Sequence, residues 1–271
     1  TQGNAVAAGL EDTFDVSPAV TGAVMFVLVG AVLLGGISSI GRVTSAFVPL
    51  MILIYIGGGI VVLALHAGDI PNALGLIFND AFTGTSATGG FVGSGIMLAM
   101  QMGVARGIFS NESGMGSAAI AAAAAKTTHP VRQGLVSMTQ TFIDTIIVVT
   151  MTGLVIITTG VWDTGEDNAA NMTAQAFSKG IGSEWGGTIV SLSIVFFAFS
   201  TILGWSYYGE RNAERAFGSW ASLPYRMLFT CVVFVGATTE IGLAWTFADI
   251  ANGLMALPNL VGMLILSGLI A

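Results

Sequence analysis

The chain has 271 residues, of which 54% are hydrophobic and only 8% are charged, and its formal net charge is −7. A typical soluble domain carries about 25% charged residues, so this sequence lacks the polar surface that a water-soluble fold of its size needs. The mean hydropathy of +0.84 agrees with that deficit. No cluster of basic residues suggests a nucleic-acid partner. The composition therefore indicates a protein that is surrounded mostly by lipid.

Seven apolar stretches are long enough to cross a membrane as helices, because about 20 residues span the ~30 Å hydrocarbon core. Their length and all-round apolarity argue against a membrane barrel, whose strands are ~10-residue alternating segments. In chain order the stretches cover residues 19–40, 45–66, 90–125, 133–160, 186–209, 226–245 and 250–271. The sequence predicts an all-α, polytopic membrane helix bundle with about seven crossings.

The connections between these stretches alternate in charge. The first, third and fifth carry Arg42, Lys126, Arg132, Arg211, Arg215 and Arg226, whereas the second, fourth and sixth are acidic, with Lys179 as their only base. By the positive-inside rule the basic connections are cytoplasmic, which places residue 1 outside and residue 271 inside. Because the chain begins without Met and ends inside an apolar stretch, we expect it to be an internal or truncated segment.

The third stretch, residues 90–125, is too long for one straight crossing, because its 36 residues would extend ~54 Å as a helix. Its middle, Arg106-Gly-Ile-Phe-Ser-Asn-Glu-Ser-Gly-Met-Gly-Ser117, is rich in poor helix formers. Irregular backbone at membrane depth is tolerated only inside protein or along a water-filled cavity. Secondary transporters bind substrate and Na⁺ at such discontinuous helices. We predict a break within Gly107–Ser117, with a second half-helix beginning in 113–117. A glycine kink without a ligand is the alternative.

Three ionisable residues lie at membrane depth, namely Arg106 and Glu112 in the third stretch and Asp144 in the fourth. Each costs ~2.5–3.5 kcal/mol at a helix centre, so such residues are functional candidates. On an intact helix Arg106 and Glu112 would lie about 240° apart, so they can pair only if the helix is broken. The alternative is a structural network of ion pairs or hydrogen bonds that holds the broken helix in place.

The fifth stretch places Thr201, Trp205 and Tyr208 at i, i+4 and i+7, on one helical face, with Ser200 beside it. Hydroxyl oxygens suit a small hard cation, and an aromatic wall often closes a small-molecule pocket. The alternative assigns Tyr208 to the interfacial aromatic belt and the two hydroxyls to bonds across helices.

Three motifs resemble the signature of the alanine/glycine:cation symporter family. They are Gly103-Val-Ala-Arg-Gly-Ile-Phe-Ser-Asn-Glu-Ser-Gly-Met-Gly-Ser-Ala118, His129-Pro-Val-Arg-Gln-Gly-Leu-Val136 and Phe199-Ser-Thr-Ile-Leu-Gly-Trp-Ser-Tyr-Tyr-Gly-Glu-Arg211. The resemblance runs over essentially the whole chain, including Ala256-Leu-Pro-Asn259, and Ser113 replaces the usual alanine. It implies a LeuT-like fold of the APC superfamily, built from two inverted five-helix repeats. Residues 1–271 would then be a single transporter domain, truncated at the N-terminus and containing core helices four to ten.

The resemblance also implies a function and a site. The function is sodium-coupled symport of a small neutral amino acid, alanine or glycine, by alternating access across the plasma (inner) membrane, with Na⁺ as coupling ion and no cofactor. The broken segment Gly107–Asn111 would hold the amino acid through backbone groups and the side chains of Phe109 and Asn111. The remaining implied roles are substrate binding for Ile108, Ser110, Thr201, Trp205 and Gln2, and Na⁺ binding for Ser200 and Thr201.

Two other classes of membrane protein are weighed against a symporter. An intramembrane serine enzyme needs a histidine base beside its serine, but His66 and His129 both fall at the ends of stretches. A channel would show a polar stripe through several stretches, and here polar residues concentrate in two. The residues alone do not distinguish alanine from glycine, the L from the D form, or Na⁺ from H⁺, so a proton-coupled transporter remains an alternative.

Overall fold

The computed structural model describes residues 1–83, 92–164 and 169–270, and over these ranges every regular element is a helix. The all-α prediction is therefore confirmed for the described part of the chain. The first two residues of the stretch 90–125 lie outside these ranges. The contacts divide the chain into two compact units. The first unit contains Thr1–Leu65 and Thr159–Phe247, and the second contains His66–Thr158 and Ala248–Ala271.

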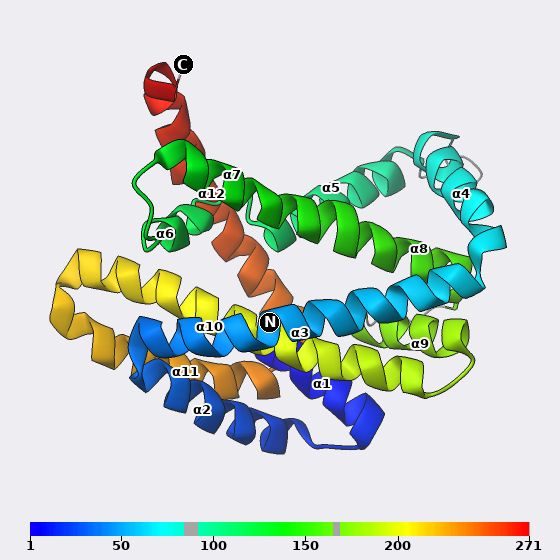
Figure 1. Cartoon of the computed structure of the whole chain (residues 1–271), viewed down its shortest axis with the longest axis horizontal. Helices are drawn as coiled ribbons and strands as arrows, with labels where there is room; N and C mark the ends of the chain where they lie inside the picture. Colours follow the sequence, from blue (N-terminus) through cyan, green and yellow to red (C-terminus); the bar gives the residue numbers. More distant parts are fainter. Residues whose placement is uncertain (84–91, 165–168, 271) are drawn as a thin grey trace. The chain divides into compact units, whose positions relative to one another are not determined.

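The first unit is built around one long central helix. Its helices are α1 (Gln2–Phe14), α2 (Pro18–Leu34), α3 (Gly36–Leu65), η4 (Val161–Asp163), α9 (Ala169–Ile181), α10 (Trp185–Phe217), η5 (Ser219–Ala221), α11 (Ser222–Thr238) and the start of α12 (Ile241–Ile270). The 33-residue α10 contacts α1, α3, α9 and α11, while α2 lies along α11 (Figure 1). Helix α2 begins at Pro18, whose fixed φ suits the first helical turn.

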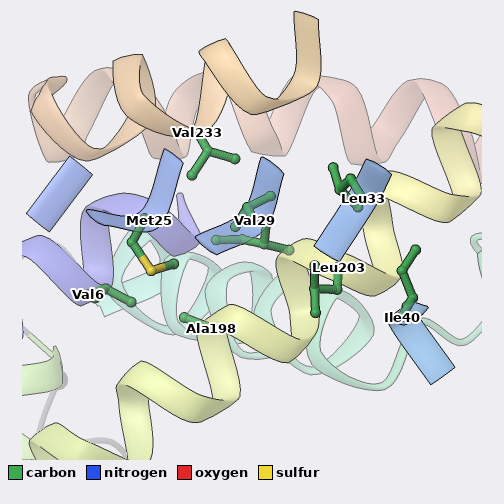
Figure 2. Packing of buried hydrophobic residues seen from close by; sticks show 9 residues of the cluster. Val6, Met25, Val29, Leu33, Ile40, Ala198, Leu203 and Val233 are labelled. Carbon is green, nitrogen blue, oxygen red and sulfur yellow. The ribbon is translucent and has the colours of Figure 1, made fainter. Parts of the chain in front are cut away.

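The core of the first unit is a stripe of apolar side chains shared by five helices (Figure 2). On α2 the stripe consists of Met25, Val29 and Leu33, which are spaced at i, i+4 and i+8 and therefore lie on one helical face. All three are almost completely buried. Around them pack Val6 of α1, Ile40 of α3, Ala198, Ile202 and Leu203 of α10, and Val233 of α11. This core fixes one face of α10 and leaves the face with Thr201 and Trp205 outside it.

Glycines allow the helices of the first unit to approach closely. A Cβ added at Gly22 of α2 would lie 3.1 Å from the Phe234 ring and 3.2 Å from Ala237 on α11. A Cβ added at Gly186 of α10 would overlap the backbone of Phe177 in α9. In lipid, where no hydrophobic force drives helices together, close contact between small residues is a main source of helix association.

The second unit contains the helix that was predicted to break. Its elements are η1 (Ala67–Asp69), α4 (Ile70–Thr83), α5 (Val92–Asn111), α6 (Ser117–Ala122), α7 (Pro130–Thr141), η3 (Phe142–Val149), α8 (Thr150–Thr158) and the rest of α12. Helix α7 continues through the π-helical segment η3 into α8 without interruption. Helix α5 packs against η3, and α4 packs against α8.

Five described helical runs are long and apolar enough to cross a membrane, judged by length and composition. They are Gly36–Leu65, Pro130–Thr158, Trp185–Phe217, Ser219–Thr238 and Gly242–Gly268. Helix α2 is apolar but shorter, with 17 residues, and α5 is not among the five. These runs establish a helical membrane protein with several crossings, but they do not confirm the predicted number of seven.

The predicted sixth crossing, residues 226–245, is wrong at its end, because α11 stops at Thr238 and α12 starts at Ile241. The backbone of Thr239 is extended, and its carbonyl accepts a 2.6 Å hydrogen bond from Nδ2 of the buried Asn4. The last carbonyls of a helix lack partners within the helix. Here Asn4, which is 235 positions away in the sequence, provides a hydrogen-bond donor for the Thr239 carbonyl just beyond the end of α11.

The first predicted connection is also misplaced. Helix α2 ends at Leu34 and α3 begins at Gly36, so Arg42 lies inside α3 and not in a loop. Gly36 has a left-handed φ of 66°, and a Cβ at this position would lie 3.4 Å from the guanidinium group of Arg226. The turn therefore depends on glycine at a position that the apolar pattern does not mark.

Candidate functional site

The predicted break in the third crossing lies at residues 112–116 of the second unit. Helix α5 continues through Asn111 and α6 begins at Ser117. Between them Glu112, Gly114 and Gly116 have φ values of 58°, 80° and 83°. These left-handed conformations cannot continue a right-handed helix. The break therefore falls inside the predicted interval, and the second half-helix begins where the sequence analysis expected.

The expectation that Gly107–Asn111 form the unwound part is wrong. Gly107, Ile108, Phe109, Ser110 and Asn111 form the last turns of α5. The backbone ends its helix after Asn111 because the Asn111 Oδ1 accepts a 2.9 Å hydrogen bond from the Ser113 N–H. Such a local side-chain bond offers the backbone an alternative to helix. These five residues thus present the C-terminal end of a helix and not an open segment.

Two further hydrogen bonds hold the broken segment. The hydroxyl of Ser117, which is almost completely buried, donates to Glu112 Oε2 at 2.7 Å and so joins the two sides of the break. Asn259 of α12 donates from Nδ2 to the Gly114 carbonyl at 3.0 Å. A Cβ at Gly116 would lie only 2.8 Å from Asn259 Oδ1. The irregular backbone is therefore fixed by side chains and by contact with α12.

Arg106 pairs with an acidic residue that the sequence analysis did not consider. Its guanidinium group donates to both carboxylate oxygens of Asp249 on α12, at 2.6 and 3.1 Å. This fork-like geometry is the strong form of the arginine–carboxylate pair. Together with the bond from Asn259 to Gly114, it ties α5 and the broken segment to α12. The structural alternative for Arg106 and Glu112, a network that holds the broken helix, is supported by these contacts.

Asp144 lies on the π-helical segment η3, at the middle of the run Pro130–Thr158. Ser110 Oγ lies 2.8 Å from each carboxylate oxygen of Asp144, and Thr145 Oγ1 lies 3.3 Å from Oδ2. Asn111 donates from Nδ2 to Thr145 Oγ1 at 3.2 Å. Two residues at the end of α5 thus meet two successive residues of η3. Single π-helical turns are frequent at functional sites.

In the first unit, Ser200, Thr201 and Trp205 lie on α10, as predicted. The hydroxyls of Ser200 and Thr201 both donate to the Phe197 carbonyl at 2.9 Å, so their lone pairs point away from the helix backbone. The Trp205 ring meets the Tyr208 ring edge to face, with centroids 5.8 Å apart. The shared face of Thr201, Trp205 and Tyr208 is thus present. Gln2 is the first residue of α1, in the same unit.

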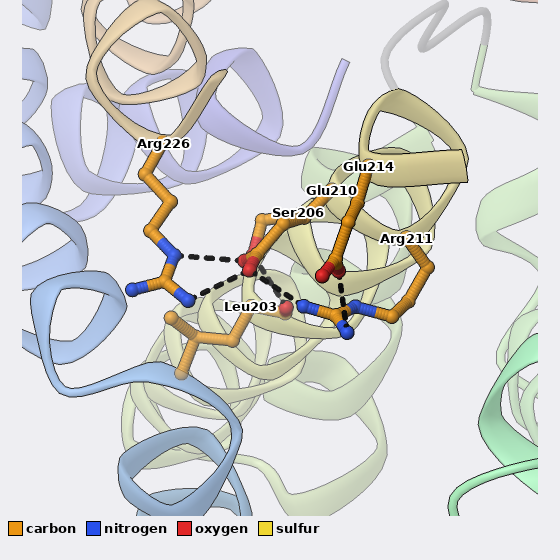
Figure 3. A network of polar contacts seen from close by, with 6 residues as sticks. All are labelled: Leu203, Ser206, Glu210, Arg211, Glu214 and Arg226. Atoms are coloured by element: carbon orange, nitrogen blue, oxygen red, sulfur yellow. Dashed lines mark hydrogen bonds and ion pairs between the residues drawn. The ribbon is translucent and has the colours of Figure 1, made fainter. Parts of the chain in front are cut away.

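A buried ionic network at the other end of α10 was not predicted. Glu210, which is 2% exposed, accepts hydrogen bonds from Arg226 Nε at 2.8 Å and Nη2 at 2.7 Å, and from Arg211 at 2.9 Å (Figure 3). Arg211 also pairs with Glu214 at 2.6 Å. From the sequence, Arg211 and Arg226 are expected only to be basic residues of a connection. The sequence signal for this network was Glu210, the one acidic residue in the motif Phe199–Arg211.

Comparison with known proteins adds an independent observation. The sequence profile of the sodium:alanine symporter family matches residues 1–271, which is the whole chain. The chain belongs to the sodium:alanine symporter family. Relatives of the chain are named as transporters or symporters. The several apolar helices agree with an integral, multi-pass membrane protein.

Individual relatives are similar over nearly the whole chain. An uncharacterised transporter of Haemophilus influenzae is 48% identical over 263 residues, covering 97% of this chain and 58% of that protein. The sodium/alanine symporter AgcS of Methanococcus maripaludis is 48% identical over 272 residues, covering 99% and 59%. The probable sodium/glutamine symporter GlnT of Bacillus subtilis is 32% identical, covering 98% and 55%. The chain spans less than three fifths of the length of these relatives.

Proposed function

We propose that this protein carries out sodium-coupled symport of a small neutral amino acid, alanine or glycine, across the plasma membrane. The observation that carries the proposal is the match of the sodium:alanine symporter family to all 271 residues. The relative named sodium/alanine symporter, at 48% identity, favours alanine. The relative named sodium/glutamine symporter, at 32% identity, is the reason to test glutamine as well.

The proposed amino-acid contacts are those that the family resemblance implies. In the second unit they are Phe109 and Asn111 at the C-terminal end of α5, with Gly107, Ile108 and Ser110 beside them. In the first unit they are Thr201 and Trp205 on α10, together with Gln2. The indole of Trp205 suits the apolar part of an amino acid, and the hydroxyl of Thr201 suits its polar part. Ser200 and Thr201 provide hydroxyl oxygens for Na⁺.

The proposed mechanism is alternating access in a LeuT-like fold, in which the seven predicted crossings correspond to core helices four to ten. Na⁺ and the amino acid bind near mid-membrane, and the site then opens to the other side. The fixed break at residues 112–116 supports this proposal, because discontinuous helices supply polar backbone at membrane depth. Coupling follows if the amino acid binds well only when Na⁺ is present.

Two substitutions on α10 test the amino-acid contacts. In the full-length gene product, Thr201→Ala and Trp205→Ala are expected to lower sodium-driven alanine uptake into proteoliposomes by about tenfold or more, which corresponds to ~1.4 kcal/mol. Thr201→Ser, which keeps the hydroxyl, should retain most of the uptake. The measurement is initial uptake of radiolabelled alanine, with glycine and glutamine as competitors.

The same helix offers matched controls. Thr188 donates to the Glu184 carbonyl with the same i to i−4 geometry as Thr201, and Trp185 is 72% exposed at the start of α10. Thr188→Ala and Trp185→Ala should therefore transport at the parent rate. Parent-like uptake in Thr201→Ala and Trp205→Ala would contradict the proposed contacts. Uptake that follows a proton gradient and ignores sodium would contradict the proposed coupling ion.

A further inference from the structure

The connection from α6 to α7, together with the first turn of α7, carries three basic residues. They are Lys126, His129 and Arg132, all exposed, and residues 126–132 are called the basic loop below. Within the part of the chain that the structure describes, none of the three forms an ion pair. The sequence has no Asp or Glu between Glu112 and Asp144. The charges of Lys126 and Arg132 are therefore not balanced by a neighbouring acid.

The basic loop is a short connection with a locally fixed backbone. The hydroxyl of Thr127 accepts a 3.4 Å hydrogen bond from the His129 N–H. His129 is extended, with a φ of −126°, as expected for a residue before proline. Pro130 then begins α7, the first part of the membrane-length run Pro130–Thr158 (Figure 1). The basic side chains are therefore held at the end of a membrane helix, where the polar headgroups of a bilayer lie.

Exposed apolar side chains form a stripe that starts at the basic loop. The stripe follows one face of the helix at the spacing i, i+4, i+7 and i+11, and its members are Val131, Leu135, Met138 and Phe142. Each of the four is more than half exposed. At a rise of 1.5 Å per residue the stripe is ~16 Å long. This length is about half of the ~30 Å hydrocarbon core, which is the depth of one leaflet.

Charge and length together match one phospholipid. Its phosphate lies at the membrane surface, and its acyl chains reach to the middle of the bilayer. Lysine binds phosphate as a point charge, and arginine binds it through a fork of N–H groups. A zwitterionic headgroup brings its own ammonium group, which Lys126 and Arg132 repel, so charge complementarity favours an anionic headgroup. Basic residues beside the cytoplasmic end of a membrane helix recognise such lipids.

We propose that the basic loop and the apolar stripe bind one anionic phospholipid of the cytoplasmic leaflet. The headgroup phosphate contacts Lys126, His129 and Arg132, and an acyl chain lies along the stripe. Every residue of this site belongs to the second unit. The inference goes beyond the proposed function, because it does not depend on which amino acid or which coupling ion is carried.

The test is a lipid-binding measurement on the purified full-length gene product in detergent. Phosphatidylglycerol and phosphatidylcholine with identical acyl chains are added separately, and bound lipid is counted by native mass spectrometry. The parent should bind its first phosphatidylglycerol with a lower Kd than its first phosphatidylcholine. Lys126→Gln and Arg132→Gln should each raise the Kd for phosphatidylglycerol about fivefold. Neither substitution should change the Kd for phosphatidylcholine.

Matched variants separate the headgroup contacts from the acyl-chain contacts. Lys179→Gln removes an exposed cation from α9 in the first unit and should leave both Kd values unchanged. Lys126→Arg keeps the charge and should bind as the parent does. Leu135→Gln should raise the Kd for both lipids. Leu228→Gln, at an apolar position of α11 that is 65% exposed, should change neither.

Three results would overturn the assignment. The first is equal affinity of the parent for the two lipids. The second is an unchanged phosphatidylglycerol Kd in the double variant Lys126→Gln with Arg132→Gln or, if that variant does not fold, in both Lys126→Gln and Leu135→Gln. The third is displacement of phosphatidylglycerol by an equal concentration of inorganic phosphate, because the basic loop would then bind a free anion and not a lipid.

Discussion

Glu210 is the buried centre of an ionic network in the first unit. Its carboxylate is held by two guanidinium groups, one from the next residue on α10 and one from Arg226 on α11. The side chain of Arg226 also lies against the glycine turn at Gly36, between α2 and α3. One carboxylate therefore organises the ends of α10 and α11 and their contact with the α2–α3 turn.

Replacing Glu210 is expected to destabilise the protein strongly. Glu210→Gln keeps the shape of the side chain but leaves two guanidinium groups beside a neutral amide. Removing one partner of a buried ion pair costs about 3 kcal/mol or more when the other charge stays desolvated. Of the two guanidinium groups, that of Arg226 is the more buried, with 21% of its side chain exposed. The apparent midpoint of thermal unfolding in detergent should fall accordingly.

A neighbouring acid provides the control for this prediction. Glu214 pairs with Arg211 at 2.6 Å, but its side chain is 32% exposed. Glu214→Gln should cost less than about 1 kcal/mol, as exposed ion pairs do. The double variant Glu210→Gln with Arg226→Gln should regain part of the lost stability. Equal small shifts for Glu210→Gln and Glu214→Gln would show that the network does not stabilise the bundle.

Sequence patterns predicted single residues well only where the contact is local. The shared face of Thr201, Trp205 and Tyr208 follows from helical periodicity and is present on α10. The partner of Arg106 was not predictable in this way, since Asp249 is 143 positions away on another helix. Long-range ion pairs leave no periodic trace in a sequence, and only their cost in lipid shows that a partner is needed.

At the scale of elements, the broken helix was predictable and its exact edges were not. Length and glycine content required a break somewhere in residues 90–125. The position was set by Asn111, whose side chain bonds to the Ser113 N–H, and by the left-handed Glu112. Composition made Gly107 look like a breaker, but it continues the helix. The connection helices α4 and α9 were not predicted, because their polar and apolar residues mix within 13 or 14 positions.

The turn of the broken helix should tolerate no side chain at Gly116. Gly116→Ala would place a Cβ 2.8 Å from Asn259 Oδ1 in a left-handed conformation that costs about 1–2 kcal/mol by itself. We expect a lower thermal midpoint and reduced alanine uptake. Adding Asn259→Ala should remove only the destabilisation that comes from the clash with the Asn259 side chain. The cost of a left-handed alanine at position 116 remains.

Gly103 on α5 is the matched position for this experiment. It is helical and exposed, and a Cβ there meets no atom within 4 Å. Gly103→Ala should therefore stabilise the helix by about 0.5–1 kcal/mol. If Gly116→Ala were as stable and as active as Gly103→Ala, the break would not be the fixed element that the structure describes.

At the scale of the molecule, composition and family motifs predicted an all-α membrane protein of the symporter family. The described residues confirm the helical class, and the family match confirms the family. The count of crossings was less predictable. An apolar stretch in the sequence can continue past the end of a helix, because distant side chains fix where the helix ends. Asn4, for example, bonds to the carbonyl just beyond the end of α11. The division into two compact units was not predicted from the sequence.

The central claim is that sodium and amino-acid movements are coupled, and coupling is reciprocal. The most direct measurement is sodium influx into proteoliposomes containing the full-length gene product, with an inward alanine gradient and no sodium gradient. The account predicts that alanine drives accumulation of radiolabelled sodium in the parent and not in Trp205→Ala. Sodium influx that is the same with and without the alanine gradient would contradict it.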